Sequence, residues 1–122
     1  SSLKRKAAGS IIGNWTSATV STEWSYLDWP VSSADLEKLR GVRFVFTSGS
    51  HALEIDGVEL LENGKVIAHD RHAGLAGKPS RGNFYKLSLP KGIHANNGCS
   101  LRARVRSVGG KSSNGKLELI KE

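Results

Sequence analysis

Hydrophobic and polar residues alternate along most of this chain in short runs, and turn-forming residues separate the runs. Alternation with a period of two is typical of strands that bury one face and expose the other. We therefore predict an all-β fold, an antiparallel β-sandwich of jelly-roll type with about eight strands and one short helix. The predicted strands cover 11–15, 25–31, 42–47, 53–62, 65–70, 85–89, 101–106 and a last segment that contains Leu117 and Leu119.

Local signals refine this pattern. Residues 32–39 are the predicted helix, because a Ser is followed three residues later by an Asp, and we expect Gly41 to end it. Pro30 indicates either that its strand lies at a sheet edge or that Pro30 is close to the end of the strand. The hydrophobic alternation slips by one residue across Asp56-Gly57, which predicts a bulge with Gly57 at positive φ. Asn63-Gly64 predicts a two-residue hairpin turn.

The aromatic residues at alternating strand positions are expected in the core, namely Trp15, Trp29, Phe44, Phe46 and Tyr85. Cys99, the single cysteine, is expected as a small apolar side chain near the start of a strand.

By length the chain is one domain, which we place at residues 10–122 after a flexible basic lead-in at 1–9. The chain lacks Met, which indicates a processed or excised piece of a larger protein. No run of about 18 apolar residues occurs, so we expect no membrane span. We expect a monomer.

The positive charge is concentrated in one part of the sequence. Residues 71–117 contain ten Lys or Arg and no Asp or Glu, whereas the first seventy residues contain seven basic and nine acidic side chains. This asymmetry favours an anionic partner for the second half of the chain, although Lys and Arg also simply keep a sandwich soluble.

If each strand crosses the sandwich once, strand direction can be followed along the sequence. The loops around 16–24, 48–51, 71–83 and 107–114 then lie at one end. Their cations hold anionic groups in this hypothesis, and their Trp, His and Asn side chains contact a sugar. The candidate ligand-binding residues are Trp24, His51, Arg71, His72, Lys78, Arg81, Asn83, Lys111 and Asn114.

Arg102, Arg104 and Arg106 form a second candidate surface. Same-face positions of a strand lie about 6.5 Å apart, so these guanidinium groups form a ladder on one outer face. Three like charges in a row repel one another, so their charge must be offset. The offset comes either from acids on neighbouring strands, such as Glu54, Asp56 and Glu118, or from an external polyanion.

Catalytic chemistry is poorly represented, and we expect no enzyme activity and no cofactor. The sequence has no G-x-S-x-G motif, no phosphate loop and no carboxylate pair marked as a general acid. His69 and His72 lie on either side of Arg71 in the sequence, and the positive charge of Arg71 would repel a metal ion bound between them. We therefore expect no transition-metal site. A structural calcium ion held by loop oxygens stays open.

Six motifs resemble those of one kind of accessory domain: GNW at 13–15, FTSGSHAL at 46–53, VELLENGK at 58–65, DRHAG at 70–74, NFY at 83–85 and SSNG at 112–115. These are non-catalytic carbohydrate-binding modules with a galactose-binding-like β-sandwich, appended to bacterial polysaccharide-degrading enzymes. The resemblance implies a secreted or cell-surface protein in which the module, covalently linked to a catalytic domain, tethers that enzyme to its substrate.

The basic second half of the chain adds a preference for anionic ligands. We therefore expect binding to a sulfated algal polysaccharide, a porphyran-, agar- or carrageenan-type galactan or a fucan. Two alternatives stay open, a structural accessory domain without a ligand and a nucleic-acid-binding domain. The second is disfavoured because the sheet-face aromatics of RNA-binding folds are missing.

Overall fold

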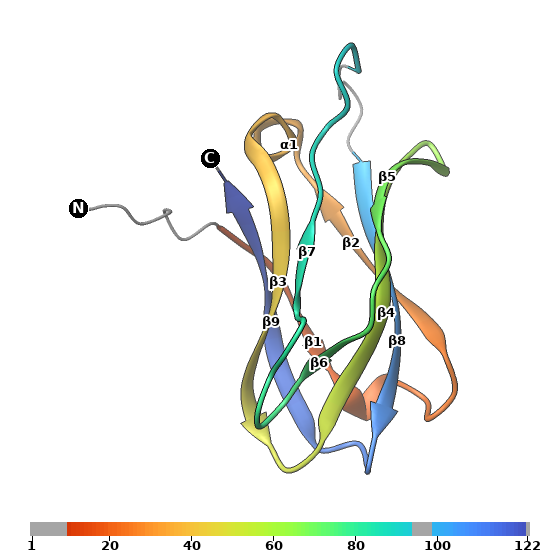
Figure 1. Cartoon of the computed structure of the whole chain (residues 1–122), viewed down its shortest axis with the longest axis vertical. Helices are drawn as coiled ribbons and strands as arrows, with labels where there is room; N and C mark the ends of the chain where they lie inside the picture. The colour runs from red at the N-terminus through yellow and green to blue at the C-terminus, as the bar shows by residue number, and fades with distance from the viewer. Residues whose placement is uncertain (1–9, 94–98, 122) are drawn as a thin grey trace, which may run out of the picture.

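The computed structural model describes residues 10–93 and 99–121, so the predicted basic lead-in at 1–9 lies outside the described residues (Figure 1). Its strands are β1 (Ser10–Thr16), β2 (Ser25–Val31), β3 (Leu39–Gly49), β4 (Ala52–Glu62), β5 (Lys65–Asp70), β6 (Gly74–Ala76), β7 (Phe84–Lys86), β8 (Cys99–Val108) and β9 (Ser113–Lys121). The helical elements are the 3-10 helix η1 (Ser17–Thr19) and the α-helix α1 (Ser33–Lys38). They confirm the prediction of an all-β fold with one short α-helix.

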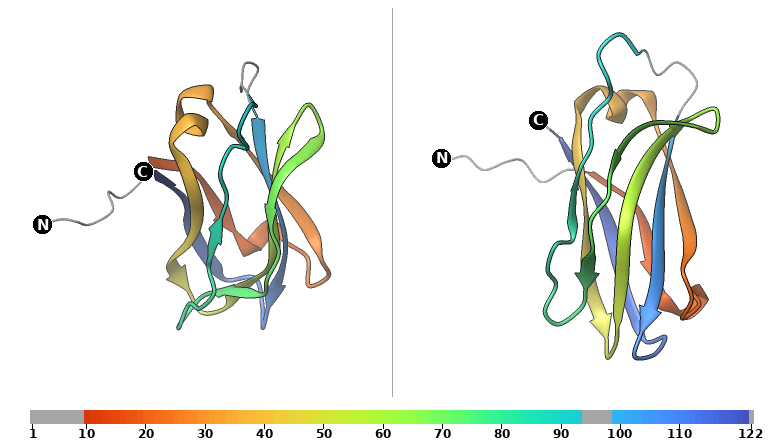
Figure 2. Two further views of the ribbon diagram at one scale, coloured as in Figure 1. Left: turned by 45° about the horizontal axis from the view of Figure 1, so that its top comes forward. Right: turned by 45° about the vertical axis from the view of Figure 1, so that its right-hand side comes forward.

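The strands form two antiparallel sheets that pack face to face. The four-stranded sheet has the order β1-β9-β3-β7, and the five-stranded sheet has the order β2-β8-β4-β5 with β6 also paired to β4. Figure 2 shows the two layers from two directions. The antiparallel sandwich is therefore confirmed, and Pro30 lies in an edge strand, β2, as predicted.

Two strand predictions were wrong in detail. The stretch 71–83, predicted as loop, contains the extra strand β6, which pairs with Leu53–Ile55 of β4 below the part of β4 that pairs with β5. Thus β5 and β6 together form one interrupted edge along β4. The strand predicted at 85–89 is shorter, because β7 pairs with β3 only over Phe84, Tyr85 and Lys86.

The predicted helix start is correct, and the predicted helix end is wrong. The Ser32 hydroxyl accepts a hydrogen bond of 3.2 Å from the Asp35 backbone N–H, as the capping signal indicates. The helix ends at Lys38, however, and Gly41 belongs to β3. Its lack of a side chain leaves room for the Phe84 ring.

The hairpin at Asn63-Gly64 is confirmed, with φ of 51° and 80° at the two residues. The bulge in β4 is also confirmed, since the pairing with β8 shifts between Ile55 and Gly57. Gly57 does not have the predicted positive φ. Arg71 instead packs closely over Gly57, because its Cγ would lie 3.1 Å from a Cβ at this position.

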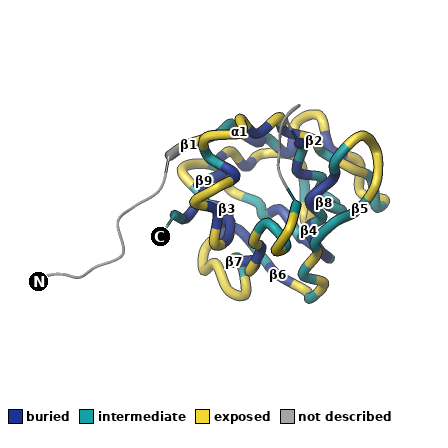
Figure 3. The backbone as a smooth tube through the Cα atoms, turned by 90° about the horizontal axis from the view of Figure 1, so that it is seen from above, coloured by how far each residue is buried: buried dark blue, intermediate teal, exposed yellow. Residues whose placement is uncertain are grey.

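The core lies between the two sheets, where the inward positions of both are apolar. Phe44 joins the layers, because its ring makes edge contacts with Trp29 and Tyr85 at centroid distances of 5.9 Å each. Trp15 and Cys99 are buried as predicted, whereas Phe46 is half-buried. In Figure 3 the buried stretches lie on the packed strands and the exposed ones largely on turns.

The loops expected to share an end do so. In Figure 1 the β3–β4 turn, the segment between β6 and β7, the β8–β9 turn and η1 all lie at the lower end. Helix α1 and the β4–β5 hairpin turn lie at the upper end. Following strand direction along the sequence therefore placed these turns correctly, but not residues 71–76, which lie along β4.

Candidate functional site

A cluster of charged side chains lies on the outer face of the five-stranded sheet. Residues directly opposite each other in a sheet share a face. Arg106 of β8 lies opposite Glu54 of β4, and Arg102 lies opposite Glu59. On the other side of β4, Leu75 lies opposite Glu54 and pairs in turn with Arg81. We call this surface the arginine face, and it comprises Trp24, Tyr26, Asp28, Glu54, Asp56, Glu59, Arg71, Arg81, Arg102, Arg104 and Arg106.

The carboxylates of β4 form a central row, and arginines lie on both sides of it. On the β8 side, Arg102 Nη2 lies 2.8 Å from Glu59 Oε1, Arg104 Nη1 lies 2.6 Å from Asp56 Oδ2, and Arg106 Nε lies 2.7 Å from Glu54 Oε1. The guanidinium ladder predicted from the sequence is therefore compensated by acids of the neighbouring strand. Two of the three suggested acids take part, whereas Glu118 pairs with Arg43 on the other sheet.

Arg71 completes the cluster from the interrupted edge between β5 and β6. Its Nη2 lies 2.8 Å from Glu59 Oε2, so Glu59 holds two guanidinium groups, one with each oxygen. Hydrogen bonds from Arg71 and from Arg102 lower the pKa of Glu59 and outweigh its partial burial. The Glu59 carboxylate is therefore ionised throughout the neutral range.

The bulge of β4 explains how Asp56 and Glu59 come to share one face. In a regular strand, residues three positions apart point to opposite sides of the sheet. The register shift at Ile55/Gly57 inserts one residue, so both carboxylates face outward while Val58 and Leu60 stay in the core. The slip in the hydrophobic pattern thus builds part of the arginine face.

Two aromatic rings border the arginines on the β2 side. The guanidinium carbons of Arg104 and Arg106 lie 4.8 and 4.6 Å from the centroid of the Trp24 ring, and that of Arg102 lies 5.1 Å from the Tyr26 ring. These contacts fall within the cation–π range. Tyr26 is 56% exposed, so much of its ring remains accessible.

Two hollows lie on this face. One, of about 240 Å³, is lined by Tyr26, Gly57 and the paired groups of Asp56, Glu59, Arg71, Arg102 and Arg104. The second, of about 290 Å³, is bordered by Glu54, Leu75 and Arg81. Across the described part of the face, five arginines accompany four carboxylates, the three of β4 and that of Asp28, which lies opposite Arg102. The surface therefore offers many oriented donors and acceptors and carries an excess of positive charge.

The structure brings together residues that the sequence assigned to two separate surfaces. Trp24, Arg71 and Arg81, predicted at the loop end, share the arginine face with Arg102, Arg104 and Arg106. Glu59 and Tyr26, which link these groups, were not among the predicted site residues. Cross-strand register would have identified both, but it cannot be read from local alternation.

Four other predicted residues lie away from this face, at the lower end of the sandwich. Nδ1 of His51 accepts a hydrogen bond of 3.3 Å from the Ser112 N–H, and Asn114 donates to the Ser48 hydroxyl over 3.4 Å. Lys78 and Lys111 are exposed and, like Arg81, make no hydrogen bond or ion pair through their side chains with any described residue.

The side chains of His72 and Asn83 are engaged within the protein. His72 Nδ1 lies 2.9 Å from Asp70 Oδ1, its Nε2 lies 2.9 Å from the Gly82 carbonyl oxygen, and its ring stacks on Tyr85 at 4.0 Å. The Asn83 amide donates to the Phe44 carbonyl over 2.7 Å. Both side chains position the 71–83 segment against the sandwich.

The described residues contain no group of three or more His, Cys, Asp or Glu side chains suited to a metal ion. No helix among them has the length and apolar character needed to cross a membrane. No protein-family model matches the sequence, and no curated protein matches it either. The two-sheet architecture is compatible with a galactose-binding-like fold.

Proposed function

We propose that this chain is a non-catalytic carbohydrate-binding module that binds an anionic, sulfated polysaccharide along the arginine face. The observation that supports this most is the combination of five arginines, four carboxylates and two aromatic rings on one rigid sheet face. In this proposal the module tethers a linked catalytic domain to a sulfated galactan or fucan.

The chemistry of the face suits a sugar chain. Sugar hydroxyls both donate and accept hydrogen bonds, and the paired guanidinium and carboxylate groups offer both functions at fixed positions. The exposed ring of Tyr26 provides an apolar surface for the C–H groups of a pyranose. Because the ion pairs and the cation–π contacts orient these side chains in advance, little conformational entropy is lost on binding.

The preference for an anion rests on the two arginines of the β5–β6 edge. Arg71 shares its carboxylate with Arg102, and Arg81 makes no ion pair with any described residue. A sulfate group beside either arginine would receive charge-assisted hydrogen bonds, and Glu59 would still keep Arg102 as a partner.

The same row of carboxylates disfavours a nucleic acid as the ligand. A phosphate backbone that followed β4 would approach Glu54, Asp56 and Glu59 along its whole length, and like charges repel at these distances. A sulfated galactan carries its charges farther apart, so its sulfates can lie beside the arginines while hydroxyls lie beside the acids.

The test is binding to the native and the desulfated form of one galactan, measured by affinity electrophoresis and calorimetry. Arg71→Gln combined with Arg81→Gln removes two positive charges, and Glu59 keeps Arg102 as a partner. We expect this double variant to bind the native galactan at least about tenfold more weakly, since one charged hydrogen bond is worth about 1.5–3 kcal/mol.

The control is Lys65→Gln combined with Lys91→Gln, which removes the same charge far from the arginine face and should leave binding unchanged. Equal affinity for native and desulfated galactan would refute the anionic preference. Absence of binding to every polysaccharide would favour a structural accessory domain. A steep salt-dependent affinity for DNA would favour the nucleic-acid reading.

A further inference from the structure

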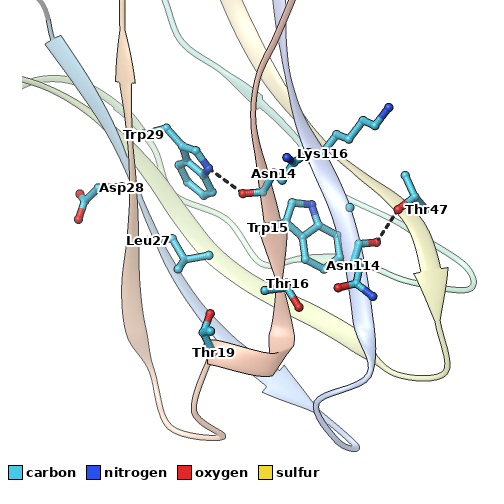
Figure 4. Close-up of a pocket in the computed structure, with 11 residues that line it drawn as sticks. Asn14, Trp15, Thr16, Thr19, Leu27, Asp28, Trp29, Thr47, Asn114 and Lys116 are labelled. Carbon is cyan, nitrogen blue, oxygen red and sulfur yellow. Dashed lines mark hydrogen bonds between the residues drawn. The ribbon is translucent and has the colours of Figure 1, made fainter.

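The two sheets are joined differently along the two sides of the sandwich. On the side of β1 and β2, Trp29 Nε1 of β2 donates a hydrogen bond of 3.1 Å to the Asn14 carbonyl oxygen of β1 (Figure 4). An indole N–H only donates, so this link does not respond to pH. On the opposite side, the link between β5 and β7 passes through ionisable side chains.

His72 is the centre of this second link. The carboxylate of Asp70, the last residue of β5, accepts a hydrogen bond of 2.8 Å from the Lys86 backbone N–H of β7 and lies 2.9 Å from His72 Nδ1. His72 Nε2 lies 2.9 Å from the Gly82 carbonyl oxygen, and the imidazole ring stacks on Tyr85 of β7. One ring therefore connects both sheets with the two ends of the segment 71–83.

The two arginines to which we assign the anion are attached to this link. Arg71 directly precedes His72, and Arg81 directly precedes Gly82. The backbones of Leu75 and Arg81 pair with each other over 2.8 and 2.9 Å, which holds Arg81 beside β6. The bond from His72 to Gly82 closes the same segment at its base. It therefore fixes where the Arg71 backbone lies relative to that of Arg81.

Both contacts of the His72 ring need a proton on the ring nitrogen. A carboxylate and a backbone carbonyl only accept hydrogen bonds, so an imidazolium donates to both of them. A neutral imidazole has one N–H, and its other nitrogen would point a lone pair at an oxygen atom. Burial opposes the charge of His72, but the hydrogen bonds to Asp70 and Gly82 outweigh it and raise the pKa of His72 above 6.5. Loss of the proton breaks one of the two contacts.

The groups of β7 and β4 that surround His72 do not replace it. Burial raises the pKa of Tyr85, and the charges of Asp70 and Asp56 add to this effect, so the stacked ring stays a neutral phenol. Lys86 contributes its backbone N–H to Asp70, while the residue itself is exposed. The charge that joins the two ends of the segment is therefore that of His72.

The second imidazole of this region, that of His69, lies on another face. His69 is opposite Glu59 in the β4–β5 pairing and is exposed on the outer side of the sheet. Its side chain makes no hydrogen bond or ion pair with any described residue, and it lowers the pKa of Asp70 less than His72 does. His69 therefore provides a matched control for His72.

We propose that the His72 imidazolium is a positioning residue for Arg71 and Arg81, through which the arginine face binds a sulfated ligand more tightly in mildly acidic than in alkaline solution. Because it concerns the regulation of the same site, this inference rests on the proposed function. The proton and the ligand favour the same arrangement of the segment 71–83, so each strengthens the binding of the other.

Calorimetry with the native sulfated galactan at constant ionic strength tests the pH dependence. We expect the affinity of the wild-type chain to fall about threefold between about pH 6 and about pH 8.5, as for the weakening of one partly exposed charged contact. His72→Gln should bind with the weaker affinity at both pH values, whereas His69→Gln should retain the fall. A fall that persists in His72→Gln, or one that disappears in His69→Gln, would overturn the inference.

A second measurement uses the unaltered chain, so it does not depend on the folding of a variant. The imidazole signals of His72 are followed by NMR during a pH titration, with and without a sulfated oligosaccharide of the same galactan. Because coupling is reciprocal, a threefold effect on affinity requires the oligosaccharide to move the His72 titration midpoint upward by about 0.5 on the pH scale. An unchanged midpoint at saturation would overturn the positioning role.

The two proposals fail in different ways. If the wild-type chain bound the sulfated galactan with the same affinity at both pH values, the role of His72 would be refuted and the arginine face would stand as the glycan site. If the chain bound no sulfated galactan even at about pH 6, both proposals would be refuted.

Discussion

At the scale of single residues, His72 occupies an unusual position between two hydrogen-bond acceptors. Its ring nitrogens face the Asp70 carboxylate and the Gly82 carbonyl, so both must carry a proton to satisfy both contacts. Burial opposes this protonation, but the hydrogen bonds to Asp70 and Gly82 outweigh it and raise the pKa of His72 above its usual 6.5. The imidazolium therefore joins β5 to the segment before β7.

This arrangement predicts that the fold loses stability as the solution becomes alkaline. A raised pKa in the folded state stabilises the protein fully below about pH 6.5 and ceases to do so as the pH rises through the folded pKa. We expect the free energy of unfolding in urea to fall by roughly 1 kcal/mol or less between pH 6 and pH 8.5, because the ring is partly exposed. In His72→Gln that fall should disappear, and an unchanged pH slope would contradict the role given to this ring.

Asp70 determines how the stabilisation from the same contact changes in acidic solution. Its burial raises the pKa of the carboxyl group, but the Lys86 backbone N–H, at 2.8 Å, and His72 outweigh this, so the pKa lies below 3.8. The stabilisation from Asp70 is present above about pH 3.8 and is lost as the pH falls through the folded pKa. The contact as a whole is strongest in mildly acidic solution.

Gly115 of β9 shows how little room its two neighbouring strands, β1 and β3, leave at one position of the four-stranded sheet. A Cβ at this residue would overlap the Val45 carbonyl oxygen and the Trp15 ring. Because the overlap involves backbone and a buried indole, we expect Gly115→Ala to destabilise the fold by about 3 kcal/mol in urea unfolding. Gly64→Asn is the control, since Asn tolerates the positive φ of that turn and should cost only a few tenths of a kcal/mol. Equal costs for the two would refute this packing argument.

At the scale of secondary-structure elements, Glu59 joins three segments of the five-stranded sheet. From β4 it holds Arg102 of β8 and Arg71 of the β5–β6 connection. These side chains are partly exposed, so each pair contributes less than about 1 kcal/mol. The role of Glu59 is to orient two guanidinium groups more than to stabilise the sheet.

A set of substitutions tests this role. Arg71→Gln and Arg102→Gln should each lower the free energy of unfolding by less than about 1 kcal/mol, because Glu59 keeps one partner in each variant. Glu59→Gln should cost about as much as both together, since it releases two cations that then repel each other. Urea unfolding gives the three values, and a cost for Glu59→Gln no larger than that for Arg71→Gln would show that the carboxylate does not act on both.

The elements also show what the sequence pattern could and could not predict. Alternation and turn chemistry gave the sandwich, the β4 bulge, the Asn63-Gly64 hairpin and the guanidinium ladder, because each depends on neighbours in sequence. Arg71 and His72 are adjacent, yet one lies over Gly57 on the outer face and the other stacks on Tyr85. Their separation depends on the pairing of β6 with β4, which no local pattern indicates.

At the scale of the whole molecule, the formal net charge of +7 is an incomplete guide to binding. Four arginines of the arginine face have carboxylate partners, so their charges are largely neutralised where they lie. Arg71 shares Glu59 with Arg102, and Arg81 makes no ion pair with a described residue, so these two arginines carry the charge in excess of the β4 carboxylates. Lysines such as Lys38 and Lys91 lie elsewhere and add to the total without adding to the site.

This distinction predicts a shallow salt dependence. When a protein binds a polyanion, the logarithm of the affinity falls linearly with the logarithm of the salt concentration, and the slope reflects the number of cationic contacts made. We expect a slope of about 2 for a sulfated galactan, because only the excess charges of Arg71 and Arg81 are available to release counterions. Calorimetric titrations at several salt concentrations measure this slope.

The Arg71→Gln, Arg81→Gln variant should flatten the slope toward zero, whereas Lys65→Gln with Lys91→Gln should leave it at the wild-type value. If the whole surface acted as a diffuse polycation, both variants would change the slope equally, and the wild-type slope would approach the total net charge. That result would show that the polyanion is held by unspecific electrostatic attraction and not at a defined site. A slope near 2 that only the first variant abolishes would instead assign the anion to the edge formed by β5 and β6.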